Sequence, residues 1–469
     1  MKIINNLLIA AVLLVVVVIG YQLRNTRYST IPFPGESTDE YSNAWVGLSL
    51  IQLGFPIGIG GLPTYPSHDY RYINVDRIFS SNTVMGNAIP LDYPWFDHPP
   101  LMGAVTGGYA YLRGARVFED ATTAIIRKPV VFVSIASLVL IFWLGSLTLG
   151  TGAGLVASIM MAFSPLMVIN SRMVQAENFI VPIFLSSLIA LYYYLHGKGR
   201  YTLYLSAILA GLGILFKLSG ASILISGLTI LLISRLEIKQ KIKDISLFLL
   251  IVLGFFSIYL VMGLVYDWPL FLKTILGNSN RKYGIGFHSI FELLTITKVT
   301  GKIYLSDGWP LLGWVSVVSL FVKKLNLRTK YIVVPLISYF IIYIFFGSES
   351  FGWYRIPFFP FIYLAGGYML ASGYESLKNL IPSVLFLFIP IGVAVDKLNA
   401  LGKLNIPVSY WRFGLPTIIF LSLLFYYFKK NRWAKTGGRL LWIFVFILAL
   451  IVSYRYTNVI DITYWFKVN

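Results

Sequence analysis

The chain has 469 residues, 57% of them hydrophobic and only 12% charged, with a formal net charge of +19 and no cysteine. A soluble domain carries roughly 25% charged residues, so this composition excludes an ordinary soluble protein. Without cysteine, the sequence can form neither disulfides nor a thiolate metal site. The excess Lys and Arg lie in short segments between apolar runs, where such residues orient a membrane protein and contact anionic lipids. We therefore expect membrane lipids as partners, and no nucleic acid.

Apolar runs of about twenty residues recur along most of the chain, which is typical of transmembrane helices. The alternating pattern of a membrane barrel is absent from the sequence. We therefore predict an all-α polytopic membrane protein with about 13 transmembrane helices, in a single domain over residues 1–469 with no separate soluble domain. The predicted helices are 7–23, 129–149, 151–169, 179–196, 201–217, 219–234, 245–266, 309–322, 331–346, 356–372, 380–396, 413–428 and 439–455.

A shorter apolar stretch, 101–118, contains four glycines and the cations Arg113 and Arg116. If this stretch lies on the membrane surface instead of crossing, the N-terminus and most basic loops share the cytoplasmic side, as the positive-inside rule requires. The loops 24–128 and 267–308 then face outward. The sequence has no Asn-x-Ser/Thr site, which favours a prokaryotic origin. We predict a multi-pass protein of a prokaryotic plasma (inner) membrane.

The outer loop 24–128 holds nine of the nineteen acidic residues. Ser37 and Glu40 have the spacing of a capping box at the start of a helix. The helix that follows has an apolar face and ends at Gly54, which predicts the first of two amphipathic surface helices in this loop; the second is 101–118. Neighbouring helix residues point about 100° apart. We therefore assign Asp39 to a pocket, whereas Glu40 is either a cap or a second catalytic carboxylate.

Two further polar segments follow along the chain. Asp97 and His98 precede two prolines and have a plainer interpretation as a rigid turn capped by Asp97. Arg172 and Glu177 lie in a short turn between two predicted helices, where polar residues are ordinary. Each pair is a modest candidate by itself.

Two cations are candidates for binding an anion. Lys217 lies near the outer end of a predicted helix; an intramembrane cation is a functional candidate, although snorkelling to the interface also explains it. Arg355 follows Trp353 and Tyr354, which have the composition of an interfacial anchor. Its guanidinium suits either a substrate phosphate or a lipid headgroup.

Taken together, these segments resemble the GT-C superfamily of membrane glycosyltransferases. The branch of dolichyl-phosphate-mannose protein mannosyltransferases is the most similar, with its bacterial relatives such as the aminoarabinose transferase that modifies lipid A. The motifs that carry the resemblance are Asp39-Glu40, His98-Pro99-Pro100-Leu101, Arg172 with Glu177, and Tyr354-Arg355-Ile356-Pro357. Their order, spacing and predicted side of the membrane agree with the family. Glu177 departs from the aspartate common in relatives, and Met102-Gly103 replaces the Gly-Lys that often follows in protein mannosyltransferases.

The resemblance implies an inverting enzyme that moves a sugar from polyprenyl or dolichyl phosphate to an acceptor hydroxyl at the outer face. The implied catalytic residues are Asp39 and Glu40, with Asp97 and Glu177 in support. The implied donor-phosphate ligands are Lys217, Arg355, Arg172 and His98. A divalent metal shared by Asp39 and Glu177 is left open, because relatives differ in metal use. The sugar and the acceptor, whether protein, lipid or glycan, are also left open.

The alternative is a flippase or transporter of lipid-linked saccharides, which would also be polytopic and basic. Transporters usually show paired repeats and charged or broken helices at the membrane midplane. Here the acidic residues gather outside the predicted helices, and no two halves of the sequence look alike. Convergence of Asp39, His98, Glu177 and Arg355 on one outward cavity would favour the enzyme.

Overall fold

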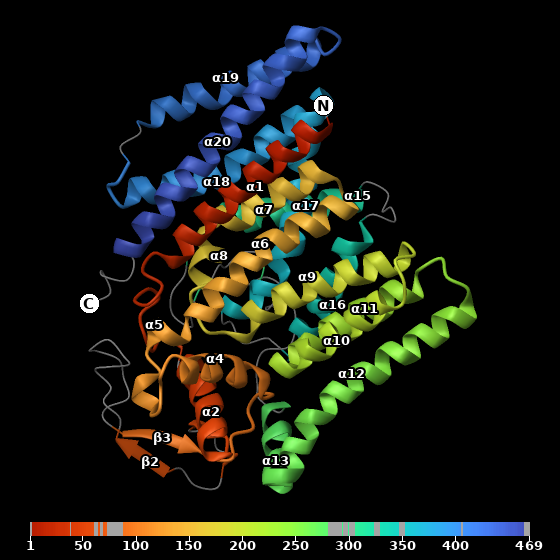
Figure 1. The fold of residues 1–469 in the computed structure, drawn as a ribbon. Coiled ribbons are helices and arrows are strands. Elements are labelled where there is room, and N and C mark those ends of the chain that lie inside the picture. Colours follow the sequence, from red (N-terminus) through yellow and green to blue (C-terminus); the bar gives the residue numbers. More distant parts are fainter. Residues whose placement is uncertain are drawn as a thin grey trace.

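The protein, seen as a computed structural model, is described over residues 2–37, 39–60, 64–65, 69–72, 88–279, 293, 299, 305–322, 329–346, 352–404 and 407–463. Long helices packed side by side form most of it, and a smaller unit of helices and strands lies at one end (Figure 1).

All thirteen segments predicted to be helical are helical in the structure. In chain order the bundle consists of α1 (Lys2–Asn25), α6 (Lys128–Thr148), α7 (Thr151–Phe163), α8 (Pro165–Asn170), α9 (Ala176–Leu195), α10 (Tyr201–Phe216), η2 (Leu218–Gly220), α11 (Ala221–Leu232), α12 (Ile238–Tyr266), α15 (Gly308–Val322), α16 (Lys330–Phe346), η3 (Gly352–Phe358), α17 (Phe359–Glu375), η4 (Leu377–Asn379), α18 (Leu380–Ala400), α19 (Val408–Tyr427) and α20 (Arg432–Thr463).

The lengths of these helices fit a membrane protein. Among the described residues, 7 helices are long and apolar enough to cross a membrane, and the remaining apolar helices have 10–17 residues. The polytopic helical class agrees with the prediction. The number of crossings, about 13, stays a prediction.

One predicted helix, 151–169, is divided in the structure at Ser164. This residue has an extended backbone with φ −62° and ψ 116°, because the proline that follows disfavours the helical conformation before it. The Ser164 hydroxyl then caps α8 by accepting from the Met167 N–H at 3.3 Å. The break directs α8 into the turn that leads to α9.

Small residues let the central helices approach closely. A Cβ on Gly154 of α7 would lie 2.4 Å from the Phe142 carbonyl oxygen of α6, and one on Gly367 of α17 would lie 2.4 Å from the Ala153 oxygen. Such contacts are the usual means of packing apolar helices in lipid. Helix α7 therefore sits in the core between α6 and α17.

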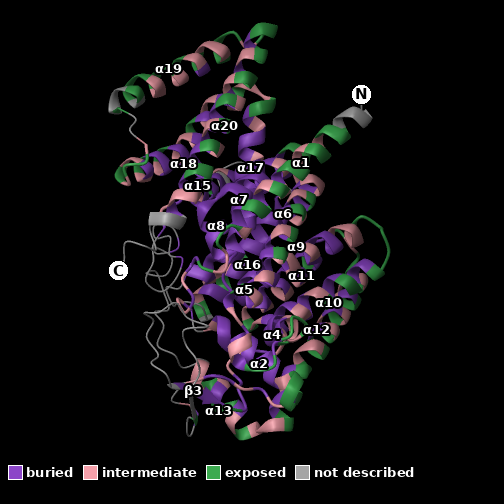
Figure 2. Ribbon diagram, turned by 60° about the vertical axis from the view of Figure 1, so that its left-hand side comes forward, coloured by how far each residue is buried: buried purple, intermediate pink, exposed green. Residues whose placement is uncertain are grey.

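The outer helices expose apolar side chains instead. Leu250 and Val265 of α12 are each 69% exposed, and Tyr427 at the end of α19 is 80% exposed. Figure 2 shows burial concentrated on the central helices and little of it on α19. Extensive exposed apolar surface of this kind is expected where lipid replaces water.

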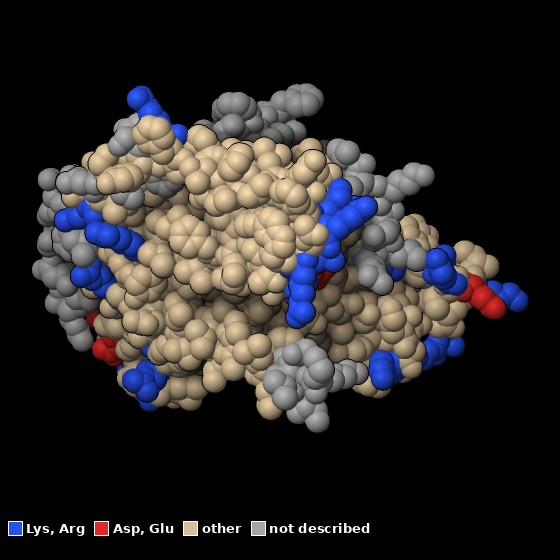
Figure 3. All heavy atoms as spheres, turned by 90° about the horizontal axis from the view of Figure 1, so that it is seen from above, with Lys and Arg blue, Asp and Glu red and all other residues tan. Residues whose placement is uncertain are grey.

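Basic residues gather at the end of the bundle opposite the small unit. Seen from that end, Lys and Arg form several clusters with few acidic residues among them (Figure 3). A cytoplasmic face would have this composition. The orientation in the membrane stays a prediction.

The small unit comes mainly from the predicted outer loop 24–128. It contains α2 (Asp39–Leu53), α4 (Leu101–Leu112) and an antiparallel sheet in the order β1 (Gly58–Ile59), β3 (Ala88–Asp92), β2 (Asp69–Tyr72). In the register, Gly58 pairs with Asp92 and Asp69 with Leu91. The all-α prediction is therefore wrong in this detail, because strands of two to five residues give almost no periodic signal.

Both predicted helices of the loop form, but each differs from expectation. Helix α2 is buried from Glu40 to Ser49, so it packs as part of the unit more than as an exposed amphipath. Helix α4 stops at Leu112, since Gly114 adopts φ +95°, a conformation that ends a helix. A further helix that was not predicted from sequence, α13 (Trp268–Ser279), begins the predicted loop 267–308.

Helices α2 and α4 meet backbone to backbone through glycines. A Cβ on Gly47 would lie 1.8 Å from the Gly103 oxygen, and one on Gly107 would lie 2.4 Å from both the Ala44 oxygen and the Leu48 nitrogen. A Cβ on Gly108, the next residue of α4, would lie 3.7 Å from Ile51 Cδ1, which is an ordinary van der Waals contact. The contact thus depends on Gly47 and Gly107.

We expect Gly107→Ala to destabilise the protein by about 1–3 kcal/mol, because the added methyl meets backbone that cannot move aside. The matched change Gly108→Ala gains the same helix propensity without the clash and should be neutral or stabilising. Thermal unfolding of both variants in detergent measures the difference. Equal stability of the two would show that the helices can separate at no cost.

Candidate functional site

A fully buried ion pair joins the start of α2 to the start of α6. The Arg127 Nε donates to Glu40 Oε2 at 2.7 Å, and Nη2 donates to Oε1 at 2.8 Å; both side chains are 0% exposed. Arg127 Nη1 also donates to the Tyr28 oxygen at 3.0 Å and the Pro32 oxygen at 2.7 Å. The planar guanidinium suits such a two-pronged contact. Arg127 therefore holds together the segment after α1, the first turn of α2 and the start of α6.

The same carboxylate fixes the turn between α8 and α9. The Val174 N–H donates to Glu40 Oε2 at 3.0 Å, and Gln175 Nε2 donates to the Ser37 hydroxyl at 2.7 Å. Ser37 and Glu40 were expected to cap one another's backbone, but their side chains contact these distant residues. The turn after α8 consequently lies against the start of α2.

Arg172 attaches this turn to the end of α1. Its Nη2 donates to the Leu23 oxygen at 2.6 Å, and the side chain is 0% exposed. The neighbouring Arg24 donates to carbonyl oxygens of Met161 at 2.8 Å and Ala162 at 3.2 Å, and the two guanidiniums repel one another. Carbonyl oxygens stabilise both buried cations. Arg172 thus has a structural contact that its sequence position did not reveal.

Lys217 and Glu177 form a second ion pair. Lys217 follows the last residue of α10, and its Nζ lies 2.6 Å from Oε1 of Glu177 in the first turn of α9. The ammonium also lies 4.2 Å from the centre of the Tyr354 ring in η3. Glu177 is fully buried, whereas Lys217 is 13% exposed. Three segments that are distant in sequence meet at this ammonium group.

Arg355, next to Tyr354, is 1% exposed within η3. Its segment is held by the Tyr339 hydroxyl of α16, which donates to the Tyr354 oxygen at 2.9 Å. The adjacent Tyr354 ring contact with Lys217 puts the η3 segment beside the second ion pair.

Asp97 and His98 lie in the chain that leads into α4. The Tyr65 hydroxyl donates to Asp97 Oδ1 at 3.4 Å and accepts from the Phe96 N–H at 2.8 Å. Burial, followed by the negative charge of Asp97, raises the pKa of Tyr65, so its hydroxyl stays protonated as a donor. The Tyr259 hydroxyl of α12 donates to the Phe96 oxygen at 2.6 Å. The segment is thereby held between the sheet side of the unit and α12.

This segment lies close to the Lys217 end of α10. Leu215 and Phe96 belong to one buried apolar cluster, against which Leu101 also packs. Because Leu215 is two residues before Lys217 and Phe96 is next to Asp97, the second ion pair and the Asp97-His98 pair occupy neighbouring positions.

The segment also lies close to the start of α2. A Cβ on Gly58 would lie 2.6 Å from the Trp95 ring and 2.8 Å from the hydroxyl of Ser42, so these two side chains border the same glycine. The Trp95 ring in turn contacts the His98 ring edge-on, with centres 5.7 Å apart. Ser42 is one helical turn after Asp39, which is half-buried at the first position of α2.

The contacts therefore form a closed circuit. They run from the start of α2 to the turn 171–177, then to Lys217 and η3, then to residues 95–101, and from there back to α2. Each of the segments that carry Asp39, His98, Glu177 and Lys217 is linked to the next by these contacts, and the η3 segment with Arg355 joins them through the ring of Tyr354 beside Lys217. These five residues make up the candidate site.

Two contributors were not identified from sequence. Arg127 is 87 residues from Glu40 along the chain and lies at the end of the predicted outer loop 24–128. Tyr354 was interpreted as an interfacial aromatic, yet its ring contacts Lys217. The only signal for Arg127 was its position against the positive-inside rule, since it lies on the predicted outer side.

A metal shared by Asp39 and Glu177 stays a prediction. Within the described ranges, no three His, Asp or Glu side chains lie close enough to hold a metal ion. The Lys217 ammonium already provides the positive charge beside Glu177.

Comparisons with known proteins bear on the fold and on the class of protein. A family model described as dolichyl-phosphate-mannose-protein mannosyltransferase matches residues 97–261, less than half of the chain. The match begins at Asp97 and extends past Lys217. A search of curated proteins found no match.

Solved structures share the fold over nearly the whole chain. ArnT from Cupriavidus metallidurans, in its apo state, is 13% identical with a TM-score of 0.53, over 96% of this chain and 76% of ArnT. AglB, an oligosaccharyltransferase from Archaeoglobus fulgidus, in complex with an inhibitory peptide and a dolichol-phosphate, is 14% identical with a TM-score of 0.50, over 96% of this chain and 56% of AglB. The arabinosyltransferase EmbB from Mycobacterium smegmatis is 12% identical with a TM-score of 0.51, over 97% of this chain and 41% of EmbB.

These matches confirm the predicted resemblance to GT-C glycosyltransferases of the mannosyltransferase and ArnT branch. Identities this low show a shared fold, and the chain spans only about half of AglB and less of EmbB. The class of enzyme that they support is a glycosyltransferase with a lipid-linked donor.

We expect Glu40→Gln and Arg127→Gln each to destabilise the protein by about 3–5 kcal/mol, since each leaves a buried partner without its counter-charge. The double variant should recover part of that loss. Unfolding in detergent, compared in a double-mutant cycle, measures the coupling.

The exposed pair of Asp396 and Lys397, 3.5 Å apart, supplies the control. Asp396→Asn should change stability by less than about 1 kcal/mol. A Glu40→Gln variant as stable as this control would contradict the structural role given to the buried pair.

Proposed function

We propose that this protein is an inverting glycosyltransferase that moves a sugar from a polyprenyl- or dolichyl-phosphate donor to an acceptor hydroxyl at the outer face of a membrane. The observation that carries the proposal is the closed circuit of contacts around Asp39, His98, Glu177, Lys217 and Arg355. The family match over residues 97–261 and the shared GT-C fold support the same reaction class. AglB, which shares the fold, has been solved with a dolichol-phosphate, and this supports a lipid-phosphate donor.

Asp39 is proposed as the general base. In the transfer, the acceptor oxygen attacks C1 of the sugar from the face opposite the phosphate, and the bond from C1 to the phosphate oxygen breaks. The acceptor proton passes to the Asp39 carboxylate, and the lipid phosphate leaves with the bonding electrons. A phosphate is a good leaving group, so no general acid is required.

Glu40 is proposed to position Asp39 and not to take the proton itself. Its two oxygens accept hydrogen bonds from Arg127 and the Val174 N–H, and no part of the side chain is exposed. A buried carboxylate whose oxygens already accept these three hydrogen bonds is out of reach of an acceptor hydroxyl. Asp39, one residue earlier, is half-buried, and its side chain leaves the helix about 100° away from that of Glu40.

Lys217 and Arg355 are proposed to bind the donor phosphate. The Lys217 ammonium has three N–H donors, of which Glu177 requires one, and the group is partly exposed. Fixed positive groups stabilise the negative charge that develops on a leaving phosphate. His98, half-buried beside Trp95, is a further donor to the phosphate in this proposal. Arg172 instead positions the turn through its bond to Leu23. Asp97, which accepts from the Tyr65 hydroxyl, is assigned a supporting role next to His98.

Glu177 is proposed to hold Lys217 in place. Its Oε1 accepts from the ammonium, while its buried Oε2 has no hydrogen-bond partner among the described residues. That second oxygen is available to accept a hydroxyl of the sugar. Glu177 would then fix both the phosphate ligand and the sugar.

We expect Asp39→Asn to retain expression and donor binding but to lose about 100-fold or more in transfer, the usual contribution of a general base. The assay supplies a panel of polyprenyl-phosphate sugars to the purified protein and detects glycosylated acceptors by mass spectrometry. Asp396→Asn, an exposed carboxylate on α18, is the matched control and should keep full activity. Near-normal turnover by Asp39→Asn would remove it from the role. Transbilayer movement of the lipid-linked sugar without transfer would favour the flippase.

We expect Lys217→Gln to weaken donor binding about tenfold, because an ammonium-to-phosphate hydrogen bond is lost. That change also leaves Glu177 buried without its counter-charge. The double variant Lys217→Gln/Glu177→Gln removes both charges, so stability should recover while donor binding stays weak. If donor binding recovers together with stability, Lys217 is structural and the phosphate is bound elsewhere.

A further inference from the structure

A cavity of about 750 Å³ lies at the opposite end of the bundle from the candidate site. It is lined by the last turns of α6 and α9, the residues after α11 and the start of α16. Helix α9 carries Glu177 in its first turn and ends at Leu195, which lines the cavity. At 1.5 Å per residue, these 20 residues separate the two places by about 30 Å. The cavity is therefore no part of the proposed active site.

The charged residues that line the cavity are cations. Arg235 and Lys330 both border it, and they are close enough to repel one another. No Asp or Glu occurs among the described residues of the lining. Lys330 is also the first residue of α16, so the positive end of the helix dipole lies at the cavity. The local electrostatics favour an anion.

Two hydroxyl groups of the lining are available to a ligand. Tyr331 is 2% exposed, and its hydroxyl has no hydrogen-bond partner among the residues that the structure describes. The hydroxyl of Ser146, a half-buried residue on the α6 side, also has no hydrogen-bond partner among those residues. A buried polar atom without a partner in a native protein calls for an unseen ligand or water. Two donors of this kind beside two cations match the oxygens of a phosphate.

We propose that this cavity binds the phosphate group of an anionic ligand, held by Lys330, Arg235 and the hydroxyls of Tyr331 and Ser146. Leucines of α6, α9 and the segment after α11 also line it, which suits the glycerol and upper acyl carbons of a phospholipid. The volume is in the range of ordinary ligand sites. A membrane phospholipid headgroup and a soluble phosphate share the chemistry that this lining recognises.

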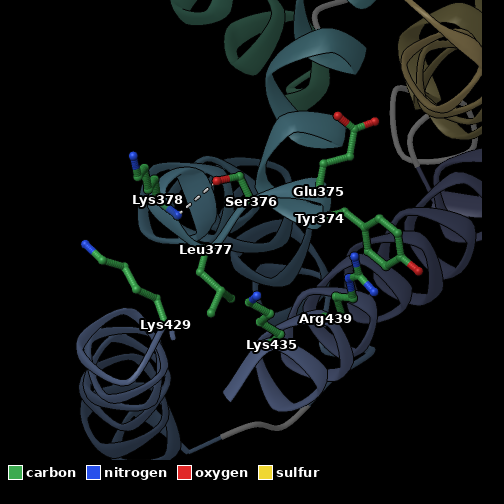
Figure 4. A pocket seen from close by; sticks show the side chains of 8 residues that line it. All are labelled: Tyr374, Glu375, Ser376, Leu377, Lys378, Lys429, Lys435 and Arg439. Atoms are coloured by element: carbon green, nitrogen blue, oxygen red, sulfur yellow. Dashed lines mark hydrogen bonds between the residues drawn. The ribbon is translucent and has the colours of Figure 1, made fainter. Parts of the chain in front are cut away.

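A second basic cavity supplies a matched control. Lys378, Lys429, Lys435 and Arg439 surround a smaller space of about 200 Å³ between the end of α17 and the start of α20 (Figure 4). It differs in two respects: the carboxylate of Glu375 is part of its lining, and none of its described residues has a buried polar side-chain atom without a partner. It has the positive charge, but none of its described residues has a buried hydroxyl without a partner.

The test is equilibrium binding of phosphatidylglycerol to the detergent-purified protein, measured by native mass spectrometry. Phosphatidylcholine, a zwitterion with no net charge, is the comparison lipid, and inorganic phosphate is the soluble comparison. Lys330→Gln and Tyr331→Phe should each weaken binding about tenfold, since each removes one hydrogen bond to a charged group. Tyr331→Phe removes a single oxygen and should not affect folding. Lys378→Gln, in the control cavity, should leave the affinity unchanged.

The lipid and phosphate arms distinguish the source of the ligand. Variant-sensitive binding of phosphatidylglycerol identifies a lipid headgroup, and variant-sensitive binding of inorganic phosphate alone identifies a soluble ligand; either supports the site. Binding that responds equally to Lys330→Gln and Lys378→Gln but not to Tyr331→Phe would show only general attraction to positive charge. That result, or the absence of binding in both arms, would overturn the proposal.

Discussion

The candidate site depends on a carboxylate that does no chemistry in our proposal. Burying the charge of Glu40 would be strongly unfavourable if it had no partners, and its partners come from several separate segments. Arg127, at the start of α6, donates to Glu40 and also to a carbonyl oxygen of the chain after α1. The turn before α9 donates to Glu40 through the Val174 N–H. Because separating these segments would leave a buried charged or polar group without its partner, the contacts favour this mutual arrangement. The first turn of α2, with Asp39, is set by that arrangement.

The two adjacent acidic residues illustrate how a helix separates framework from chemistry. Successive residues differ by about 100° around the axis, so one side chain of the pair enters the protein while the other is directed elsewhere. Glu40 is 0% exposed and paired, and Asp39 is half-buried at the first position of α2. A similar division appears at the second ion pair, where buried Glu177 holds the partly exposed Lys217. In both cases the buried residue fixes the position of the one that can reach a substrate.

The sequence alone predicted the helices and the residues of the motifs. It did not predict which distant side chains those residues contact. Long apolar runs identify a membrane helix without any knowledge of its neighbours, and His98-Pro99-Pro100 marks the start of α4 by local sterics. The proline after Ser164 also indicates the break there, but the continuous apolar run led to the prediction of a single helix over 151–169. Arg127 could not be assigned, because nothing near it in sequence indicates a partner 87 residues away. The sheet was not predicted for a different reason. Strand β1 has only two residues, and it is recognised as a strand only through its pairing with β3.

The contrast between the two ends of α9 follows from electrostatics in a low-dielectric bundle. At its first turn, Glu177 is paired with Lys217, so the free protein carries no large uncompensated charge at this pair, and a donor phosphate must fit the geometry in order to bind. At its last turn, Arg235 and Lys330 line one cavity without a carboxylate among the described residues of the lining, and the anion that we propose there would reduce their repulsion. An anion at that end would stabilise α9 and α16 against one another, as a ligand that binds only the folded state must. Helix α9 thus connects two proposed phosphate sites. At the Lys217 end, binding would depend on the fit of the donor phosphate to the geometry. At the Lys330 end, binding would depend on neutralising the two cations.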